Sequence, residues 1–92
     1  MSHEWDPKKA KTNEEKHGVS FEEALEVFED PRLLTRYDKD HSTLGEDRWQ
    51  VLGRSRAQRI LFVVYVEREG DTLRLISARR ATVRETALYR RR

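Results

Sequence analysis

Residues 48–78 read RWQVLGRSRAQRILFVVYVEREGDTLRLISA, and this stretch decides the fold. Three segments in it have the composition of strands: residues 48–54, 60–67 and 73–78. The breaks between them, at residues 55–58 and 69–71, are short enough for hairpins. The stretch therefore predicts an antiparallel meander of three strands.

The first of these strands alternates with a period of two. One face should carry Trp49, Val51 and Gly53, and the other Arg48, Gln50, Leu52 and Arg54. The middle strand is apolar on both faces, which is typical of a strand at the centre of a sheet. Arg48 and Arg54 should therefore share one face of the sheet.

A helix is predicted ahead of the sheet, from Pro7 to His17. Asp6 is a suitable N-cap for it, and Gly18 a suitable C-terminal cap. One face of this helix is polar where apolar residues are usual: Ala10, Asn13, Glu14 and His17. A helix with such a stripe either faces solvent or lines a site.

A second helix should begin after Ser20, which forms a capping box with Glu23. Its apolar face repeats at helical spacing in Phe21, Ala24, Leu25 and Phe28. The pair Asp30-Pro31 should end it.

The remaining elements are short. Trp5 closes a possible first strand, residues 33–37 form another, and residues 38–46 make a polar loop. Thr82 and Glu85 form a second capping box, which starts a final helix that ends in the arginine tail. The pattern predicts one α+β domain over residues 1–92.

Composition excludes several classes of protein. The chain has no cysteine, which excludes disulfides and thiolate metal sites and agrees with a cytoplasmic location. Its long apolar run, residues 60–66, is too short to span a membrane, and the N-terminus does not resemble a signal peptide. No P-loop, dinucleotide glycine motif or zinc-spaced histidine pair is present, so we expect no cofactor and no metal.

The net charge of +2 conceals a division between the two halves of the chain. Residues 1–47 hold 7 Lys and Arg against 13 Asp and Glu, a net charge of −6. Residues 48–92 hold 12 against 4, a net charge of +8. This division indicates either a face that binds an anion or a fold whose two halves neutralise each other.

Four arginines are candidates for binding phosphate: Arg48, Arg54, Arg79 and Arg80. The planar guanidinium binds a phosphate through two hydrogen bonds, and several of them together would stabilise the charge that builds during phosphoryl transfer. In the alternative interpretation, these arginines form surface ion pairs with the acidic first half.

Lys16 and His17, at the end of the first helix, are the best candidates for proton transfer. Histidine titrates near neutral pH, which suits a general acid or base. In the alternative, both residues merely cap the helix, where its dipole favours a cation. Trp49 and Tyr65 fit core packing better than stacking on nucleic-acid bases, and Tyr89 fits either.

Several motifs together resemble the BrnT family. They are the opening EWDPKKA from residue 4, Asn13, KHGVSFEEA from residue 16, EDRW from residue 46, GRS from residue 53, and ISARRAT from residue 76 followed by Glu85. They occur in order and with family-like spacing over nearly the whole chain. The loop from Pro31 to Gly45 adds little to the resemblance.

The resemblance implies a toxin of a type II toxin–antitoxin system with a RelE-like α+β fold. The expected arrangement has two N-terminal helices on an antiparallel sheet, and a C-terminal helix. It implies a metal-independent endoribonuclease that inhibits translation and growth. The implied partners are RNA and a DNA-binding BrnA-like antitoxin, so any contact with DNA would be indirect.

In this interpretation Arg48, Arg54, Arg79 and Arg80 hold the phosphate, and Lys16 or His17 helps with proton transfer or substrate positioning. Two other classes remain open. A non-catalytic nucleic-acid-binding domain would bind RNA in a salt-dependent way without cutting it. A protein-interaction domain would use the basic sheet and the tail, residues 90–92, only for an acidic partner.

Overall fold

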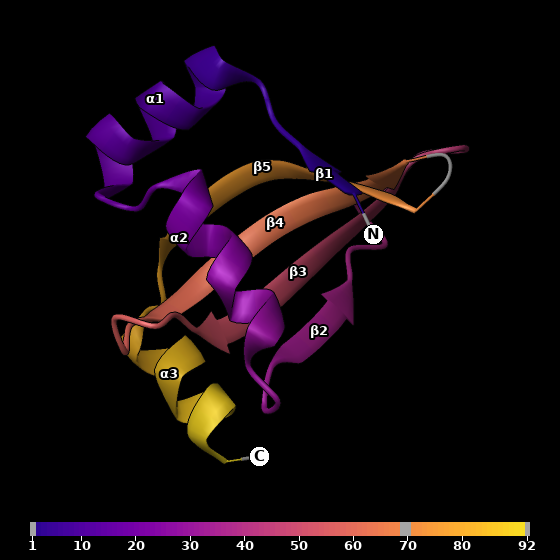
Figure 1. Cartoon of the computed structure of the whole chain (residues 1–92). Helices are drawn as coiled ribbons and strands as arrows, with labels where there is room; N and C mark the ends of the chain where they lie inside the picture. Colours follow the sequence, from indigo (N-terminus) through magenta and orange to yellow (C-terminus); the bar gives the residue numbers. More distant parts are fainter. Residues whose placement is uncertain (1, 69–70, 92) are drawn as a thin grey trace.

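The computed structural model of the chain describes residues 2–68 and 71–91. In these residues five strands form one sheet in the order β1-β5-β4-β3-β2 (Figure 1). The strands are β1 (Ser2–Glu4), β2 (Leu34–Tyr37), β3 (Asp47–Arg54), β4 (Ile60–Arg68) and β5 (Thr72–Arg80). The predicted break at residues 69–71 and the tail at residues 90–92 lie partly outside the described residues.

Strands β2 to β5 pair antiparallel with their neighbours in chain order. The expectation of a purely antiparallel sheet is wrong, because β1 adds to the free edge of β5 in parallel. Its three residues are all exposed, so they lack the apolar alternation that would have predicted how the strand pairs.

The helices lie on both sides of this sheet. Helix α1 (Pro7–His17), helix α2 (Phe21–Leu25) and the 3-10 turn η1 (Glu26–Glu29) follow one another, and α2 and η1 cross one face of the sheet (Figure 1). The buried core between them includes Val19, Phe21 and Val27, which pack with Val51, Leu61, Val63, Leu75 and Ala78 of the sheet. Helix α3 (Val83–Arg90) lies at the end of the sheet where β3 and β5 finish.

The predicted caps define the helix ends. The Asp6 carboxylate accepts a hydrogen bond from the Lys8 backbone N–H at 2.9 Å. Gly18 closes α1 in the left-handed conformation, with φ of 69°, which suits a residue without a Cβ atom. Thr82 and Glu85 form the full reciprocal capping box at the start of α3.

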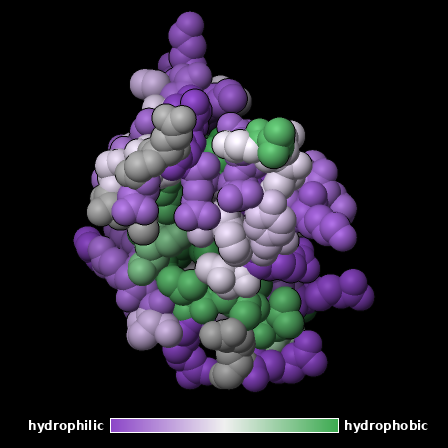
Figure 2. Space-filling model, turned by 90° about the vertical axis from the view of Figure 1, so that its right-hand side faces the viewer, coloured by the Kyte–Doolittle hydropathy of each residue, from purple (hydrophilic) through white to green (hydrophobic). Residues whose placement is uncertain are grey.

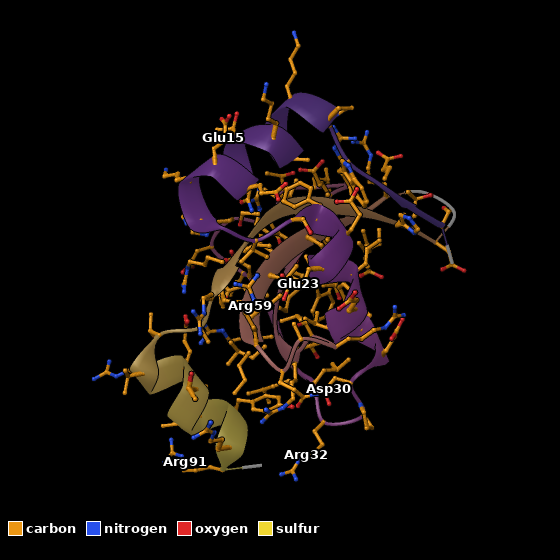
Figure 3. All side chains as sticks on the ribbon, turned by 60° about the vertical axis from the view of Figure 1, so that its left-hand side comes forward. Glu15, Glu23, Asp30, Arg32, Arg59 and Arg91 are labelled. Carbon is orange, nitrogen blue, oxygen red and sulfur yellow. The ribbon has the colours of Figure 1, made fainter. Side chains whose placement is uncertain are left out.

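The other capping box is only half formed. Ser20 accepts the Glu23 backbone N–H at 3.0 Å, but the Glu23 carboxylate accepts hydrogen bonds from Arg59 and Ser55 instead (Figure 3). A guanidinium is a stronger partner for a half-buried carboxylate than a backbone N–H group. Arg59 also donates to the carbonyl oxygen of Gly18 at 3.0 Å, so it fixes the end of α1 to the start of β4.

The close approach of η1 to the sheet depends on Gly53. A Cβ atom at this position would lie 2.7 Å from the Cβ atom of Val27. Glycine therefore lets the 3-10 turn pack directly on β3, with Val27 fully buried.

Candidate functional site

The face of the sheet opposite α2, here called the outer face, is organised in cross-strand rows. The register gives three rows: Arg48, Val66 and Arg74; Gln50, Val64 and Ser77; and Leu52, Phe62 and Arg79. Residues directly opposite each other in antiparallel strands share a face. The outer face therefore has an apolar centre with arginines on both sides of it.

Arg48 and Arg54 share the outer face, as the strand period predicted. They do not converge, because six residues of strand separate them by about 20 Å. The Arg54 guanidinium lies 5.8 Å from the ring centroid of Tyr89, so this arginine packs against α3. Tyr89 is buried, and its hydroxyl donates to Asp30, which gives this aromatic residue a packing role.

Arg48 is the arginine whose environment most clearly lacks a partner. Its Nε–H group is buried without a hydrogen-bond acceptor, and no carboxylate in residues 2–68 and 71–91 pairs with its guanidinium. A buried donor without an acceptor is costly and calls for an explanation. A bound anion would supply the missing acceptor.

Arg79 is held on two sides. Its Nη1 and Nη2 atoms donate to the two carboxylate oxygens of Glu85 at 2.9 and 3.0 Å. Its guanidinium carbon lies 4.3 Å from the ring centroid of Phe62. The hydrogen bonds from Arg79 lower the pKa of the Glu85 carboxyl. The Nε edge of the guanidinium has no described partner, so it can bind a phosphate while Glu85 holds the other edge.

Arg80 lies apart from the other three candidate arginines. It is opposite Leu61 of the buried core, which places it on the face that α2 covers. Its positive charge contributes, after that of Arg59, to the lowered pKa of Glu23. Adjacent residues of a strand point to opposite faces, so Arg79 and Arg80 do not reach one phosphate from the same side.

The polar stripe of α1 serves mainly to dock the helix. Asn13 is buried, and its amide nitrogen donates to the carbonyl oxygens of Ala78 at 2.8 Å and Val19 at 3.1 Å. Its amide oxygen accepts the Ala78 backbone N–H at 3.1 Å. Among the described residues, strand β1 pairs with residues 72–74 of β5. Further along the free edge of β5, Asn13 satisfies the backbone N–H and carbonyl groups of Ala78.

Lys16 and His17 line a groove of about 340 Å³ between α1 and the edge of β5. The other lining residues are Lys8, Lys9, Thr12, Asn13, Ile76 and Ser77. Within the described residues none of these lysines pairs with a carboxylate. Glu15 lies on the side of α1 that points away from the sheet (Figure 3). The groove, which we call the α1 groove, is therefore basic.

The α1 groove meets the outer face at Ser77. This residue lines the groove and also belongs to the middle row of the outer face, opposite Val64. The next outer-face residue of β5 is Arg79, about 7 Å further along the strand. Ile76 has no partner in β4, because the register shifts there, and such bulges are frequent beside active sites. The groove that Lys16 and His17 line thus includes the outer-face residue of β5 that precedes Arg79, whereas Arg54 packs on α3 and Arg80 lies on the opposite face.

Sequence reasoning missed three parts of this site: Lys8, Lys9 and Ser77. Lys8 and Lys9 lie at helical spacing from Lys16, so the three lysines share one side of the helix. The net negative charge of residues 1–47 conceals this signal. Tyr65 packs against the core as predicted, edge to face with Phe28. Trp49 is half-buried and packs edge to face with the exposed Tyr37 instead of with the core cluster. No group of three or more potential metal ligands occurs among the described residues, and none of their helices is long and apolar enough to cross a membrane.

Comparison with known proteins agrees with this architecture. The crystal structure of the Brucella abortus ribonuclease toxin BrnT matches with a TM-score of 0.65 and 24% sequence identity, over 89% of this chain and 99% of that one. The curated proteins gave no match. The model of the family described as the ribonuclease toxin BrnT of type II toxin–antitoxin systems matches residues 5–85. Because that match covers most of the sequence, the chain belongs to the BrnT family of ribonuclease toxins.

Proposed function

We propose that this chain is a metal-independent endoribonuclease whose reacting phosphate binds where the α1 groove meets the outer face. The observation that carries the proposal is the position of Ser77, which lines the groove with Lys16 and His17 and precedes Arg79 on the outer face. In this proposal the proton-transfer group and the phosphate ligand act together at this position on β5.

We propose that the side chains of this site carry out the transesterification of RNA. The RNA 2′-oxygen attacks the adjacent phosphorus, the bond to the 5′-oxygen breaks, and the products are a 2′,3′-cyclic phosphate and a 5′-hydroxyl. His17 accepts the proton of the attacking 2′-hydroxyl or gives a proton to the leaving 5′-oxygen, and solvent water exchanges the other proton. Lys16 and the free edge of Arg79 stabilise the charge that develops on the phosphate.

The remaining cations extend the site along the RNA. Lys8 and Lys9 offer contacts for the backbone on one side of the reacting phosphate. Arg48, with its unpaired Nε–H group, offers a contact further across the outer face. Arg54 and Arg80 contribute only to the positive field in this proposal, since Arg54 packs on Tyr89 and Arg80 faces the other side of the sheet.

The biological setting follows from the family. Membership in a toxin–antitoxin family implies an antitoxin partner and an RNA substrate. We propose further that the fold is RelE-like, that the toxin acts in the cytoplasm, and that RNA cleavage inhibits translation and growth. The antitoxin would be a BrnA-like DNA-binding protein, so that the toxin contacts DNA only through it.

The test uses the purified chain, single-stranded RNA and excess EDTA. We expect cleavage in EDTA, and a loss of at least about 100-fold in rate for His17→Ala, the usual size of a proton-transfer contribution. Lys11→Ala is the matched control, because it removes a cation from α1 outside the groove. RNA binding without cleavage would instead favour the non-catalytic alternative.

Arg79 needs two variants, because its ion pair with Glu85 also supports the structure. Arg79→Lys keeps the positive charge but loses the planar guanidinium, which can bind Glu85 through one edge and a phosphate through the other. Arg79→Ala loses both the charge and the guanidinium. We expect cleavage to fall in both variants while circular dichroism shows a folded protein. A folded Arg79→Ala protein that cleaves RNA at the wild-type rate, and still arrests growth, would remove Arg79 from the mechanism.

A further inference from the structure

A second groove lies between α3 and the outer face, and we call it the α3 groove. It has a volume of about 490 Å³, within the usual range for ligand pockets of roughly 300–1,000 Å³. Its apolar lining comes from Leu34, Val51, Leu52 and Phe62 of the sheet and Leu88 of α3. Leu88 is 42% exposed, which is high for a leucine beside a core.

The border of the α3 groove is cationic. Arg36 donates to the neutral side-chain amide of Gln50, and Arg84 is exposed on α3. In the described part of the chain neither arginine pairs with a carboxylate. Figure 2 shows the same character on the side of the molecule that β2 borders, where apolar side chains gather near the C-terminal end and hydrophilic ones surround them.

We propose that the α3 groove is the docking site for an amphipathic segment of the antitoxin, with apolar side chains toward the groove and acidic side chains beside them. An apolar floor between unpaired arginines is complementary to such a segment and binds it by the helix-in-groove mode. The proposal rests on the proposed function only in naming the antitoxin as the protein that carries the segment.

RNA fits this groove less well than a peptide does. The floor is mostly aliphatic, whereas single-stranded RNA is usually held by aromatic stacking. Phe62 is the aromatic residue of the lining, and one of its ring faces is covered by Arg79.

Docking here would also inactivate the toxin. Glu85 lines the groove and holds Arg79, and Arg79 lies over Phe62 of the groove floor. A segment seated in the groove therefore covers the approach to Arg79 from the outer face. Neutralisation then needs no direct contact with the α1 groove.

The test measures binding of the antitoxin encoded by the reading frame next to that of the toxin. We expect Leu88→Arg to weaken its affinity for the full-length toxin at least about tenfold in titration calorimetry, as for a central interface anchor. Arg84→Glu should weaken it as well. Val83→Arg is the matched control, because Val83 is an 89% exposed apolar residue of α3 outside the groove.

RNA cleavage by the same variants separates the outcomes. Leu88→Arg and Arg84→Glu proteins that cleave RNA normally but resist the antitoxin support the docking site. Normal antitoxin affinity in both variants overturns the docking site and leaves the ribonuclease proposal intact. If the product of the adjacent gene does not bind the wild-type toxin, the docking site is likewise overturned and the ribonuclease proposal stands. Lost RNA binding with normal antitoxin affinity assigns the groove to RNA and overturns the proposal. A chain that cleaves no RNA but binds the antitoxin through the groove refutes only the ribonuclease proposal.

Discussion

Asn13→Ala should be among the most destabilising substitutions in α1. The change removes three hydrogen bonds, two to Ala78 and one to Val19, from a position that is only 8% exposed. Each such bond contributes about 0.5–1.5 kcal/mol net, and an orphaned buried N–H costs about 1–3 kcal/mol. We therefore expect a loss of about 2–4 kcal/mol in the free energy of unfolding, a large part of the stability of a small domain.

Urea denaturation followed by circular dichroism measures this loss. The midpoint should fall while the slope of the transition stays constant, because the native fold is kept. Thr12→Ala is the control, since its hydroxyl bonds to the Lys8 carbonyl oxygen on the exposed side of the same helix. A loss below about 0.5 kcal/mol for Asn13→Ala, the usual range for surface changes, would refute the docking role of Asn13.

Asn13→Asp tests the same geometry by charge. The introduced carboxyl would face the carbonyl oxygens of Val19 and Ala78, which accept hydrogen bonds from Asn13 in the wild type. Two acceptors disfavour the ionised form, so its pKa should lie above that of the unfolded chain. A group with a raised pKa stabilises the fold below its unfolded pKa, and that contribution is lost as the pH rises through the folded pKa. The deficit against wild type should therefore be greatest at neutral pH and shrink in acid.

Three further predictions concern the packing of the sheet. Gly53→Ala should lower the free energy of unfolding by about 1–3 kcal/mol through its clash with Val27, as thermal denaturation would show. The hydrogen bond from Arg59 lowers the pKa of the Glu23 carboxyl below its ordinary value of 4.5. The stability that this pair contributes is therefore present above pH 4.5 and is lost as the pH falls through the lowered pKa. Glu23→Gln should flatten that part of the acid denaturation curve. Tyr89→Phe should cost about 1 kcal/mol by removing one hydrogen bond, and proteolysis of α3 should become faster.

Most of the strands and helix ends could be predicted because each carries a local signal. The alternation around Val51 gives β3 its face, and Asp6, Gly18 and Thr82 mark helix ends through hydrogen bonds that span only a few residues. The parallel pairing of β1 could not be predicted in this way. It joins Ser2–Glu4 to a strand about 70 residues away, and nothing in three exposed residues specifies that partner.

The sequence predicted which types of residue the candidate site contains, but not which of those residues lie close together in the fold. Strand period correctly placed Arg48 and Arg54 on one face, yet it says nothing about the 5.8 Å contact of Arg54 with Tyr89. The polar stripe of α1 indicated either solvent or a site, and the structure adds a third outcome, since Asn13 is buried against the edge of β5. A buried polar residue on a helix face is ambiguous until its partner is known, because docking and ligand binding use the same hydrogen-bonding groups.

The charge division between the halves was the first functional signal, and both of its interpretations apply to different residues. Arg59 and Arg79 form ion pairs with carboxylates, which is the neutralising interpretation. The α1 groove, however, takes its lysines from the acidic half, because Lys16 and Glu15 lie on different sides of one helix. Binding of an anion depends on cations that face one site and have no carboxylate partner there. The net charge of one half of the chain reports neither the direction in which a side chain points nor whether it is paired. By that criterion the α1 groove is a stronger candidate for binding an RNA strand than the arginine-rich sheet as a whole, because its lysines face one site and pair with no carboxylate in the described residues.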